Sequence, residues 1–205
     1  ERGHRPHPDH DRRAVEMSFP RYPAYKDSGV EWLGAVPAHW EVKRLKAATT
    51  HNDEVLDEST MPDTEIVYVD ISSVDGVSGI KMKETMPFSA APSRARRRVR
   101  DGDVIISTVR TYLKAIARIR APEENLIVST GFAVIRPRSK LMPDFLGCLV
   151  SASYLIEQVI ARSTGVSYPA INASELVAIP VPLPPLPEQT QIATFLDRET
   201  AKIDE

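Results

Sequence analysis

A run of basic side chains is the feature of this sequence with the clearest chemical potential. Nine Lys or Arg residues and only two Asp residues lie between Arg94 and Arg120, so this window has a net charge of +7. The whole chain has a net charge of −2, which leaves −9 for the remainder. A basic window on an acidic body is suited to binding a polyanion, and the alternative is a solvated charged face. The charge distribution alone leaves both interpretations open.

Three segments could supply such contacts. The first is a run of arginines before the Gly102 turn, which favours phosphate contact. The second is a group of polar and aromatic residues after a predicted strand, and the third is a group of small hydroxyl donors after a predicted helix. The second segment could equally be a hairpin turn, and the third could be a helix C-cap with Gly165 as the stop. The candidate contact residues are Arg94, Arg96, Arg97, Arg98, Arg110, Thr111, Tyr112, Lys114, Ser163, Thr164, Gly165, Ser167 and Tyr168.

Signals of catalysis are weak in this sequence. It has no Gly-Lys-Ser/Thr phosphate loop, no zinc-ligand spacing and no aromatic-capped tetrapeptide for a flipped base. Glu41-Val42-Lys43 has a form found in metal-dependent nucleases, but no carboxylate precedes it on a predicted strand. The single cysteine, Cys148, lies in an apolar run and is expected to be a buried thiol in a reducing compartment. We therefore expect a binding protein with no catalytic residue, no metal site and no cofactor of its own.

The length of 205 residues and the 42% hydrophobic content fit one domain plus an appendage. We expect residues 1–18 to be a disordered extension, residues 19–185 to be the binding domain and residues 186–205 to begin a long helix. No apolar run is long enough to span a membrane, so we expect a soluble, cytoplasmic protein. Four aromatic residues among turn formers are expected to anchor the head of the domain by ring burial: Tyr22, Tyr25, Trp32 and Trp40.

The periodicity of apolar residues predicts an α+β fold, a mixed β-sheet with packed helices. A helix is expected from Pro143 with its stop at Gly165. A brief turn should precede the next strand, and the prolines at 182, 184 and 185 should prevent its continuation. The predicted strands are Ile66–Ile71, Val104–Val109, Leu113–Ile119, Leu126–Val128, Phe132–Arg136 and Val177–Val181.

A last helix is predicted after Pro187, with apolar residues at spacings of four and seven. Ile192, Leu196 and Ile203 would form the first part of a coiled-coil seam. Nothing else in the chain offers these residues a matching stripe, so we expect a partner helix to cover them.

The two ends of the chain resemble those of type I restriction–modification specificity subunits. The tail motif runs from Leu183 to Gln189 (LPPLPEQ) and continues with Phe195-Leu196-Asp197. The head motif runs from Tyr25 to Gly34 (YKDSGVEWLG) and continues with Val36-Pro37, His39-Trp40 and Lys43-Arg44-Leu45. Gly102–Ser107 (GDVIIS) is similar to a central motif of the family, and Ser163-Thr164-Gly165 with Ile171-Asn172 to a late one. The resemblance implies one target-recognition domain, which reads a DNA sequence and is followed by the start of a spacer helix.

The resemblance also implies partners. Modification subunits would carry S-adenosylmethionine and methylate adenine, and restriction subunits would add ATP- and Mg-dependent translocation and cleavage. The chain itself would bind double-stranded DNA, and a second recognition domain or a homodimer partner would complete the two-part arrangement of the family. Two other classes stay open on the residues alone: an autonomous endonuclease, and a protein-interaction adaptor that uses only its C-terminal helix and ignores DNA.

Overall fold

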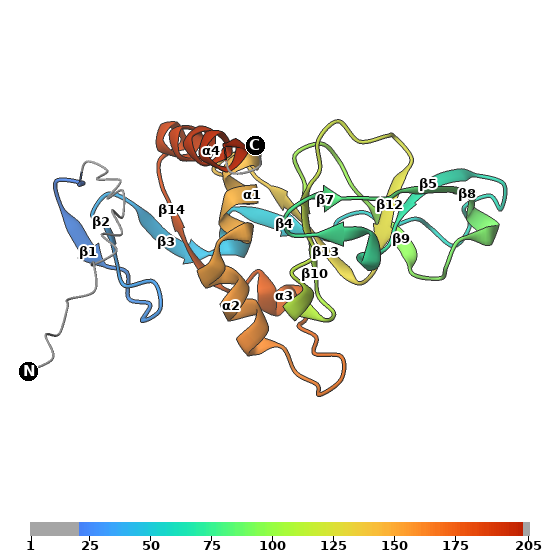
Figure 1. The fold of residues 1–205 in the computed structure, drawn as a ribbon, viewed down its shortest axis with the longest axis horizontal. Helices are drawn as coiled ribbons and strands as arrows, with labels where there is room; N and C mark the ends of the chain where they lie inside the picture. Colours follow the sequence, from blue (N-terminus) through green and yellow to red (C-terminus); the bar gives the residue numbers. More distant parts are fainter. Residues whose placement is uncertain (1–20, 203–205) are drawn as a thin grey trace, which may run out of the picture.

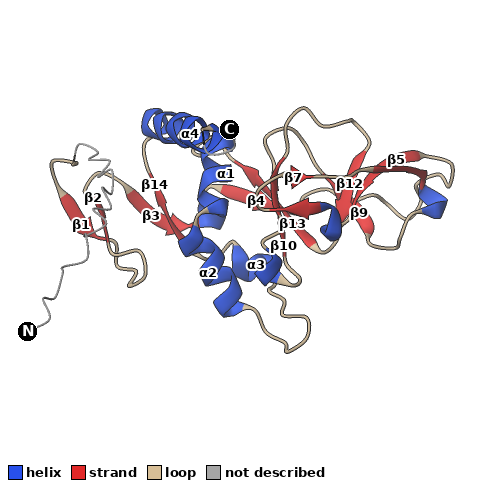
Figure 2. Ribbon diagram, viewed as in Figure 1, coloured by secondary structure: helices blue, strands red, loops and turns tan. Residues whose placement is uncertain are grey.

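A computed structural model describes residues 21–202, which form an elongated molecule with its helices near the middle (Figure 1, Figure 2). The extension predicted for residues 1–18 and the seam residue Ile203 lie outside the described residues. Within residues 21–202 the α-helices are α1 (Pro143–Ser151), α2 (Ser153–Arg162), α3 (Ala173–Leu176) and α4 (Leu186–Ala201).

The first sheet is antiparallel throughout and has the strand order β11-β10-β13-β4. Val104 and Ile106 of β10 lie in a core shared with α1 and α2, whereas Ile105 lies in a second core with other strands. Successive side chains of a strand point to opposite faces, so β10 separates the two cores. The strands are β4 (Thr49–His51), β10 (Val104–Ser107), β11 (Ile116–Arg118) and β13 (Phe132–Pro137).

The second sheet lies toward the far end of the molecule in Figure 1 and has the order β8-β5-β12-β9. Its central pair, β5 and β12, is parallel, and its two outer pairs are antiparallel. The predicted α+β class with a mixed sheet is therefore confirmed. The strands are β5 (Glu65–Val69), β8 (Glu84–Pro87), β9 (Ala95–Arg98) and β12 (Leu126–Ser129).

Three two-stranded pairs complete the fold. One is the head hairpin, one joins the head of the chain to its tail, and one packs beside β11. The pairs are β1 (Tyr25–Asp27) with β2 (Ala35–Pro37), β3 (Glu41–Arg44) with β14 (Pro180–Leu183), and β6 (Val74–Asp75) with β7 (Gly79–Ile80).

The single helix predicted from Pro143 is in fact two. Ala152 has extended backbone angles and separates α1 from α2, which bend by 61°. Each helix buries its own apolar face, with Leu146 in α1 and Leu155 in α2 fully buried in the same core. The spacing of apolar residues continues across Ala152, so the sequence does not predict the break between the two helices. Within residues 21–202, no single helix is long and apolar enough to cross a membrane.

Two strand predictions also need correction. The segment predicted as one strand from Leu113 begins as a 3₁₀ turn, η4 (Thr111–Leu113), and pairing starts only at Ile116. The strand predicted for Val177–Val181 is shifted to β14 and includes Pro182. A proline is tolerated there because, among residues 21–202, β14 pairs only with β3 and its other edge is free.

The turn at Gly102-Asp103 is fixed by a buried ion pair. Asp103 is only 1% exposed, and Arg136 of β13 donates to both of its carboxylate oxygens at 2.9 and 2.8 Å. The amide of Arg100 also donates to Asp103, at 2.8 Å. Gly102 has a φ of +84°, which suits glycine. The predicted tight turn is therefore present, and its carboxylate ties β10 to β13.

Candidate nucleic-acid interface

Two segments far apart in the sequence meet at one surface, where most residues are exposed but the predicted contact residue Thr111 is buried. We call residues 110–114 and 163–168 the two-loop surface; they lie below β10 and α2 in Figure 1. The hydroxyl oxygens of Thr111 and Ser163 lie 2.8 Å apart, and the amide of Arg110 donates to the carbonyl of Pro169 at 2.8 Å. The structure thus brings together two of the three segments that the sequence singled out.

The first loop has an unusual backbone. Arg110 and Lys114 flank η4 and have φ values of +51° and +53°, in the left-handed region. Such a conformation costs roughly 1–2 kcal/mol for a residue other than glycine. It turns Tyr112 and Leu113 outward, so that each is about half exposed (50% and 51%).

A neighbouring hairpin, which the sequence analysis did not select, supports this backbone. A Cβ atom on Gly76, between β6 and β7, would lie 2.8 Å from the carbonyl oxygen of Lys114. The hairpin therefore packs against Lys114 so closely that only glycine fits. Asp75-Gly76 is a turn signal in the sequence, but nothing in the sequence indicates which loop it contacts.

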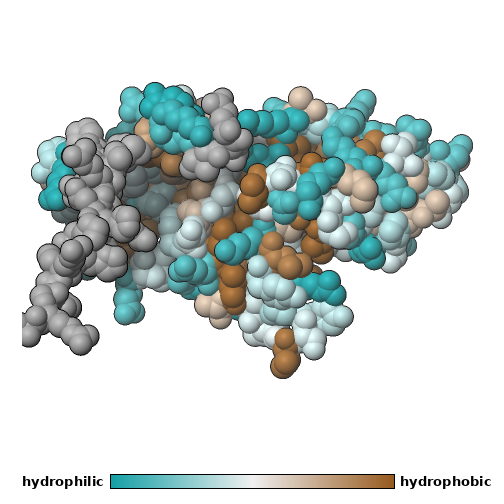
Figure 3. Space-filling view, in the orientation of Figure 1, coloured by the Kyte–Doolittle hydropathy of each residue, from teal (hydrophilic) through white to brown (hydrophobic). Residues whose placement is uncertain are grey.

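The second loop is closed at its base and exposed at its tip. Thr164 and Ala170 exchange two backbone hydrogen bonds of 2.9 Å. Gly165 follows with a φ of +110°, which explains the glycine. Val166 is fully exposed. Figure 3 shows a small hydrophobic area at the lower side of the molecule, where the loop after α2 lies in Figure 1. The tip also presents Ser167 to solvent.

Arg110 and Tyr168 connect the two loops through their side chains. The guanidinium carbon of Arg110 lies 4.5 Å from the centroid of the Tyr168 ring, in cation–π geometry. Tyr168 is 60% exposed. Within residues 21–202 neither Arg110 nor Lys114 forms an ion pair. The two-loop surface therefore presents positive charge that no carboxylate of the described chain neutralises.

The arginines of β9 are less uniform than the sequence suggested. Arg94 is held by Asp70 at 2.8 Å, and Arg96 lies 4.7 Å from the centroid of Phe88. Arg97 is half-buried, donates to a carbonyl of β13 at 3.2 Å, and has its pKa lowered by burial. Only Arg98 is both exposed and without an ion pair within the described residues.

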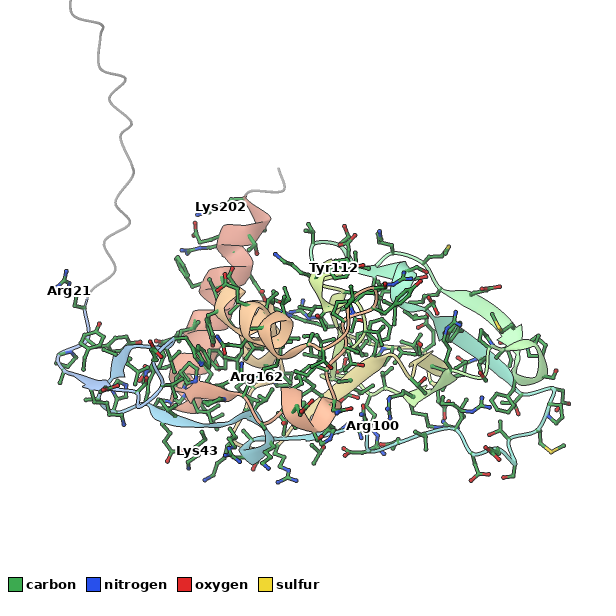
Figure 4. All side chains as sticks on the ribbon, turned by 90° about the horizontal axis from the view of Figure 1, so that it is seen from below. Arg21, Lys43, Arg100, Tyr112, Arg162 and Lys202 are labelled. Atoms are coloured by element: carbon green, nitrogen blue, oxygen red, sulfur yellow. The ribbon has the colours of Figure 1, made fainter. Side chains whose placement is uncertain are left out.

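The basic window does not form one continuous stripe. Besides Arg94, three of its members face carboxylates: Arg100 pairs with Glu54, and Arg118 and Arg120 both pair with Asp197. Figure 4 shows Arg100 and Tyr112 toward opposite edges of the view. Carboxylates of other elements therefore neutralise part of the basic window, and its free positive charge is smaller than the sequence suggested.

The start of β9 is nevertheless linked to the two-loop surface. The amide of Thr130 donates to the carbonyl of Arg94, and the amide of Thr108 donates to the carbonyl of Gly131, both at 2.8 Å. Ile171, just after the second loop, donates to the carbonyl of Thr108 at 3.0 Å. Backbone hydrogen bonds between neighbouring segments therefore connect Arg94 to the two-loop surface.

Helix α4 lies against α1 and exposes part of the predicted seam. Ile192 is half-buried against the core, and Leu196 is 39% exposed. The residues of α4 that are buried are Gln189 and Ala193. The exposure of Leu196 agrees with a seam open to a partner, whereas Ile192 is partly covered by the domain itself.

The tail motif is explained by two adjacent side chains at the start of α4. Glu188 accepts hydrogen bonds from the head at both oxygens: from His39 at 2.6 Å, Trp40 at 2.8 Å and Tyr22 at 3.1 Å. Partial burial opposes its ionisation, but these hydrogen bonds prevail and hold the pKa of Glu188 below its ordinary value. The predicted aromatic anchors Tyr22 and Trp40 therefore act as hydrogen-bond donors, whereas Tyr25 is 50% exposed and buries little of its ring.

Gln189, the second of these side chains, is fully buried. Its amide oxygen accepts from the backbone of Met142 at 2.8 Å, and its nitrogen donates to the carbonyls of Lys140 and Pro184 at 3.0 and 2.8 Å. Met142 precedes the first turn of α1. Gln189 thus joins the starts of α1 and α4.

Arg118 fixes the far end of α4. Its side chain crosses α1 over Gly147, donates to Cys148 Sγ at 2.9 Å and pairs with Asp197 at 2.9 Å. A Cβ atom on Gly147 would lie 2.0 Å from Arg118 Nε. Burial raises the pKa of the Cys148 thiol, although Arg118 opposes the shift.

The residues considered for catalysis have structural partners. Glu41 of β3 pairs with Lys43 of the same strand at 2.8 Å. A cavity of about 400 Å³ lies beside them, lined also by His39, Lys140 and the residues 183–186. Among residues 21–202, no group of three His, Cys, Asp or Glu side chains is placed to hold a metal ion.

Comparison with known proteins agrees with the resemblance of the two chain ends. Residues 80–204 match the family model described as the type I restriction modification DNA specificity domain. A Methanocaldococcus jannaschii protein, assigned as the MjaX specificity subunit of a type I restriction enzyme, is 26% identical over 181 residues. The match covers 80% of this chain and 40% of that protein.

Two solved structures are also similar. The crystal structure of the HsdS subunit from Thermoanaerobacter tengcongensis is 36% identical, with a TM-score of 0.74. A structure described as addressing complex assembly and conformational transition of the type I R-M system is 36% identical as well, with a TM-score of 0.75. Each match covers 82% of this chain and 44% of the other chain, so this chain spans less than half the length of these relatives.

Proposed function

Because this chain belongs to the type I restriction modification DNA specificity domain family, we propose that it recognises a specific sequence in double-stranded DNA. It would do so as the target-recognition part of a specificity subunit. The observation that carries this proposal is the two-loop surface, where Arg110 and Lys114 have no ion-pair partner among the described residues while polar and aromatic side chains face solvent. Such a surface offers both charge for phosphates and side chains for base edges.

Within the interface, we assign different roles to different residues. Lys114 and Arg98 contact phosphates, which are the same at every site and determine position and affinity. Tyr112, Ser167 and Arg110 face the base edges and determine sequence preference. The two-loop surface is suited to the second role because its backbone is held by hydrogen bonds at both ends.

The chain would carry no catalysis of its own. Methylation of adenine with S-adenosylmethionine would belong to modification subunits, and ATP- and Mg-dependent translocation and cleavage to restriction subunits. Such a role would place the chain in the cytoplasm, with the DNA that it reads. The exposed seam at Leu196 supports assembly through α4, with a helix of a second recognition domain or of a second copy of this chain as partner.

The first test is selection of bound DNA from a pool of random duplexes by the purified chain. We expect one sequence to be enriched, with an affinity that falls steeply as salt concentration rises. A chain that enriches no sequence would contradict the proposal. Magnesium-dependent cutting that is abolished by Glu41→Ala would instead support an endonuclease. Affinity purification should recover a methyltransferase subunit with the chain.

A further inference from the structure

We propose that Arg110 and Tyr168 form one guanine-reading unit, in which the tyrosine ring holds the arginine fork in position for the O6 and N7 atoms of a guanine in the major groove. This inference rests on the proposed function, since it assigns a base to one pair of residues within the proposed interface.

The first argument is the free hydrogen-bonding capacity of Arg110. The guanidinium carbon of Arg110 lies over the Tyr168 ring, 4.5 Å from its centroid, and within residues 21–202 no protein group accepts a hydrogen bond from the guanidinium. A guanidinium that lies over an aromatic ring keeps N–H donors for another partner. By contrast, the guanidinium groups of Arg136 and Arg118 donate hydrogen bonds to carboxylates.

The second argument is preorganisation. The backbone of Arg110 is left-handed, and its amide is tied to Pro169, the residue after Tyr168 in the chain. Thr111 is tied to Ser163 at the base of the second loop. The two partners of the stack are therefore fixed relative to each other before DNA arrives, which lowers the entropy that binding costs.

The third argument is the match of chemistry. A guanidinium fork offers two parallel donors, and guanine offers two adjacent acceptors in the major groove. A phosphate contact would need only charge, which Lys114 already supplies on the same surface. An arginine whose plane is fixed by an aromatic ring is better suited to a planar base edge than to a phosphate.

The test combines selection with one modified base. The wild-type chain selects its sequence from random duplexes, and each guanine of that sequence is replaced in turn by 7-deazaguanine, which lacks the N7 acceptor. We expect one such replacement to weaken binding by the wild-type chain about tenfold. The same replacement should leave binding by Arg110→Met almost unchanged, because methionine has no hydrogen-bond donor for the N7 atom.

Variants of the ring separate stacking from hydrogen bonding. Tyr168→Phe keeps the ring and should select the same guanine, whereas Tyr168→Leu should reduce discrimination at that position by several-fold. Arg162→Ala is the matched control: Arg162 is exposed at the base of the same loop and bound to Gln158, so its loss should weaken binding to all sequences alike.

The outcomes distinguish the two proposals. A wild-type chain that enriches no sequence refutes the proposed function and this inference with it. An Arg110→Met chain that selects the same guanine and is still sensitive to 7-deazaguanine refutes the inference alone. Equal weakening of all sequences by Arg110→Ala, with no change in preference, would mean a phosphate contact and would also refute it. Thermal unfolding within a few degrees of the wild type verifies that each variant is folded.

Discussion

The indole nitrogen of Trp40 lies 2.8 Å from a carboxylate oxygen of Glu188, although 148 positions separate them in the chain. This contact joins the head of the domain to the first turn of α4. Below it, β3 and β14 pair along four residues. The two segments that resemble the ends of family members are therefore one structural unit, which sets where α4 leaves the domain.

The charge of Glu188 should make this unit sensitive to acid. Its pKa is depressed in the folded state, so its contribution to stability is present above the unfolded value of about 4.3 and is lost as the pH falls through the lower folded value. We expect Glu188→Gln to lower the free energy of unfolding by roughly 1 kcal/mol at pH 7. The difference should shrink at pH 3 in denaturant titrations. An exposed control, Glu31→Gln, should show no such pH dependence.

Gln189 should be among the most sensitive polar residues of the chain. Gln189→Leu removes three hydrogen bonds and leaves the amide of Met142 and two carbonyls without their partner, which should cost about 2–4 kcal/mol. Gln191, two positions later, is exposed, and Gln191→Ala should change the unfolding free energy by less than about 0.5 kcal/mol. Similar values for the two variants would contradict the role assigned to Gln189.

Gly147 offers a prediction in which the sign changes with the background. Gly147→Ala should destabilise the wild type, since the new Cβ displaces Arg118 and breaks its ion pair with Asp197. In the Arg118→Ala background the same change should stabilise by up to about 1 kcal/mol, because alanine favours a helix over glycine. Thermal unfolding of the four proteins of this cycle gives the coupling. Additive effects would show that Arg118 does not cross α1 in solution.

Arg98 and Arg97 should behave differently although they are neighbours. Arg98→Ala should weaken binding to all DNA and lower the slope of log affinity against log salt by about one unit, as for one phosphate contact. Arg97→Ala should chiefly reduce stability, because its half-buried side chain donates to Phe132 of β13. Fluorescence anisotropy over a salt series, with unfolding curves for both variants, separates the effects. A change of sequence preference in Arg98→Ala would contradict the phosphate role.

Some features of this protein follow from the sequence because they depend on neighbouring residues. The strand at Val104 and the turn at Gly102 are local in this sense. So is the start of α4, where Pro187 follows at an early helical position and suits a first turn. The exposure of Leu196 also follows from its place on a helix with few apolar residues.

Other features depend on which distant segments pack together, and the sequence alone did not decide them. The break at Ala152 interrupts a continuous periodicity, because the core requires two helices at an angle. The basic window was one charge cluster in the sequence, but in three dimensions Arg100, Arg118 and Arg120 are paired with carboxylates from other elements. The sequence shows where the cations stand in the chain, but not which of them form an ion pair with a carboxylate of another element.

The two-loop surface illustrates both cases. The sequence determined the types of its residues, since Arg110 and Tyr168 both lie in polar, turn-forming segments. Only the tertiary structure brought their side chains within 4.5 Å, through hydrogen bonds from Arg110 to Pro169 and between Thr111 and Ser163. The physical reason is that these contacts form between segments separated in the chain by three strands (β11, β12 and β13) and two helices (α1 and α2), so they exist only when the whole domain is folded.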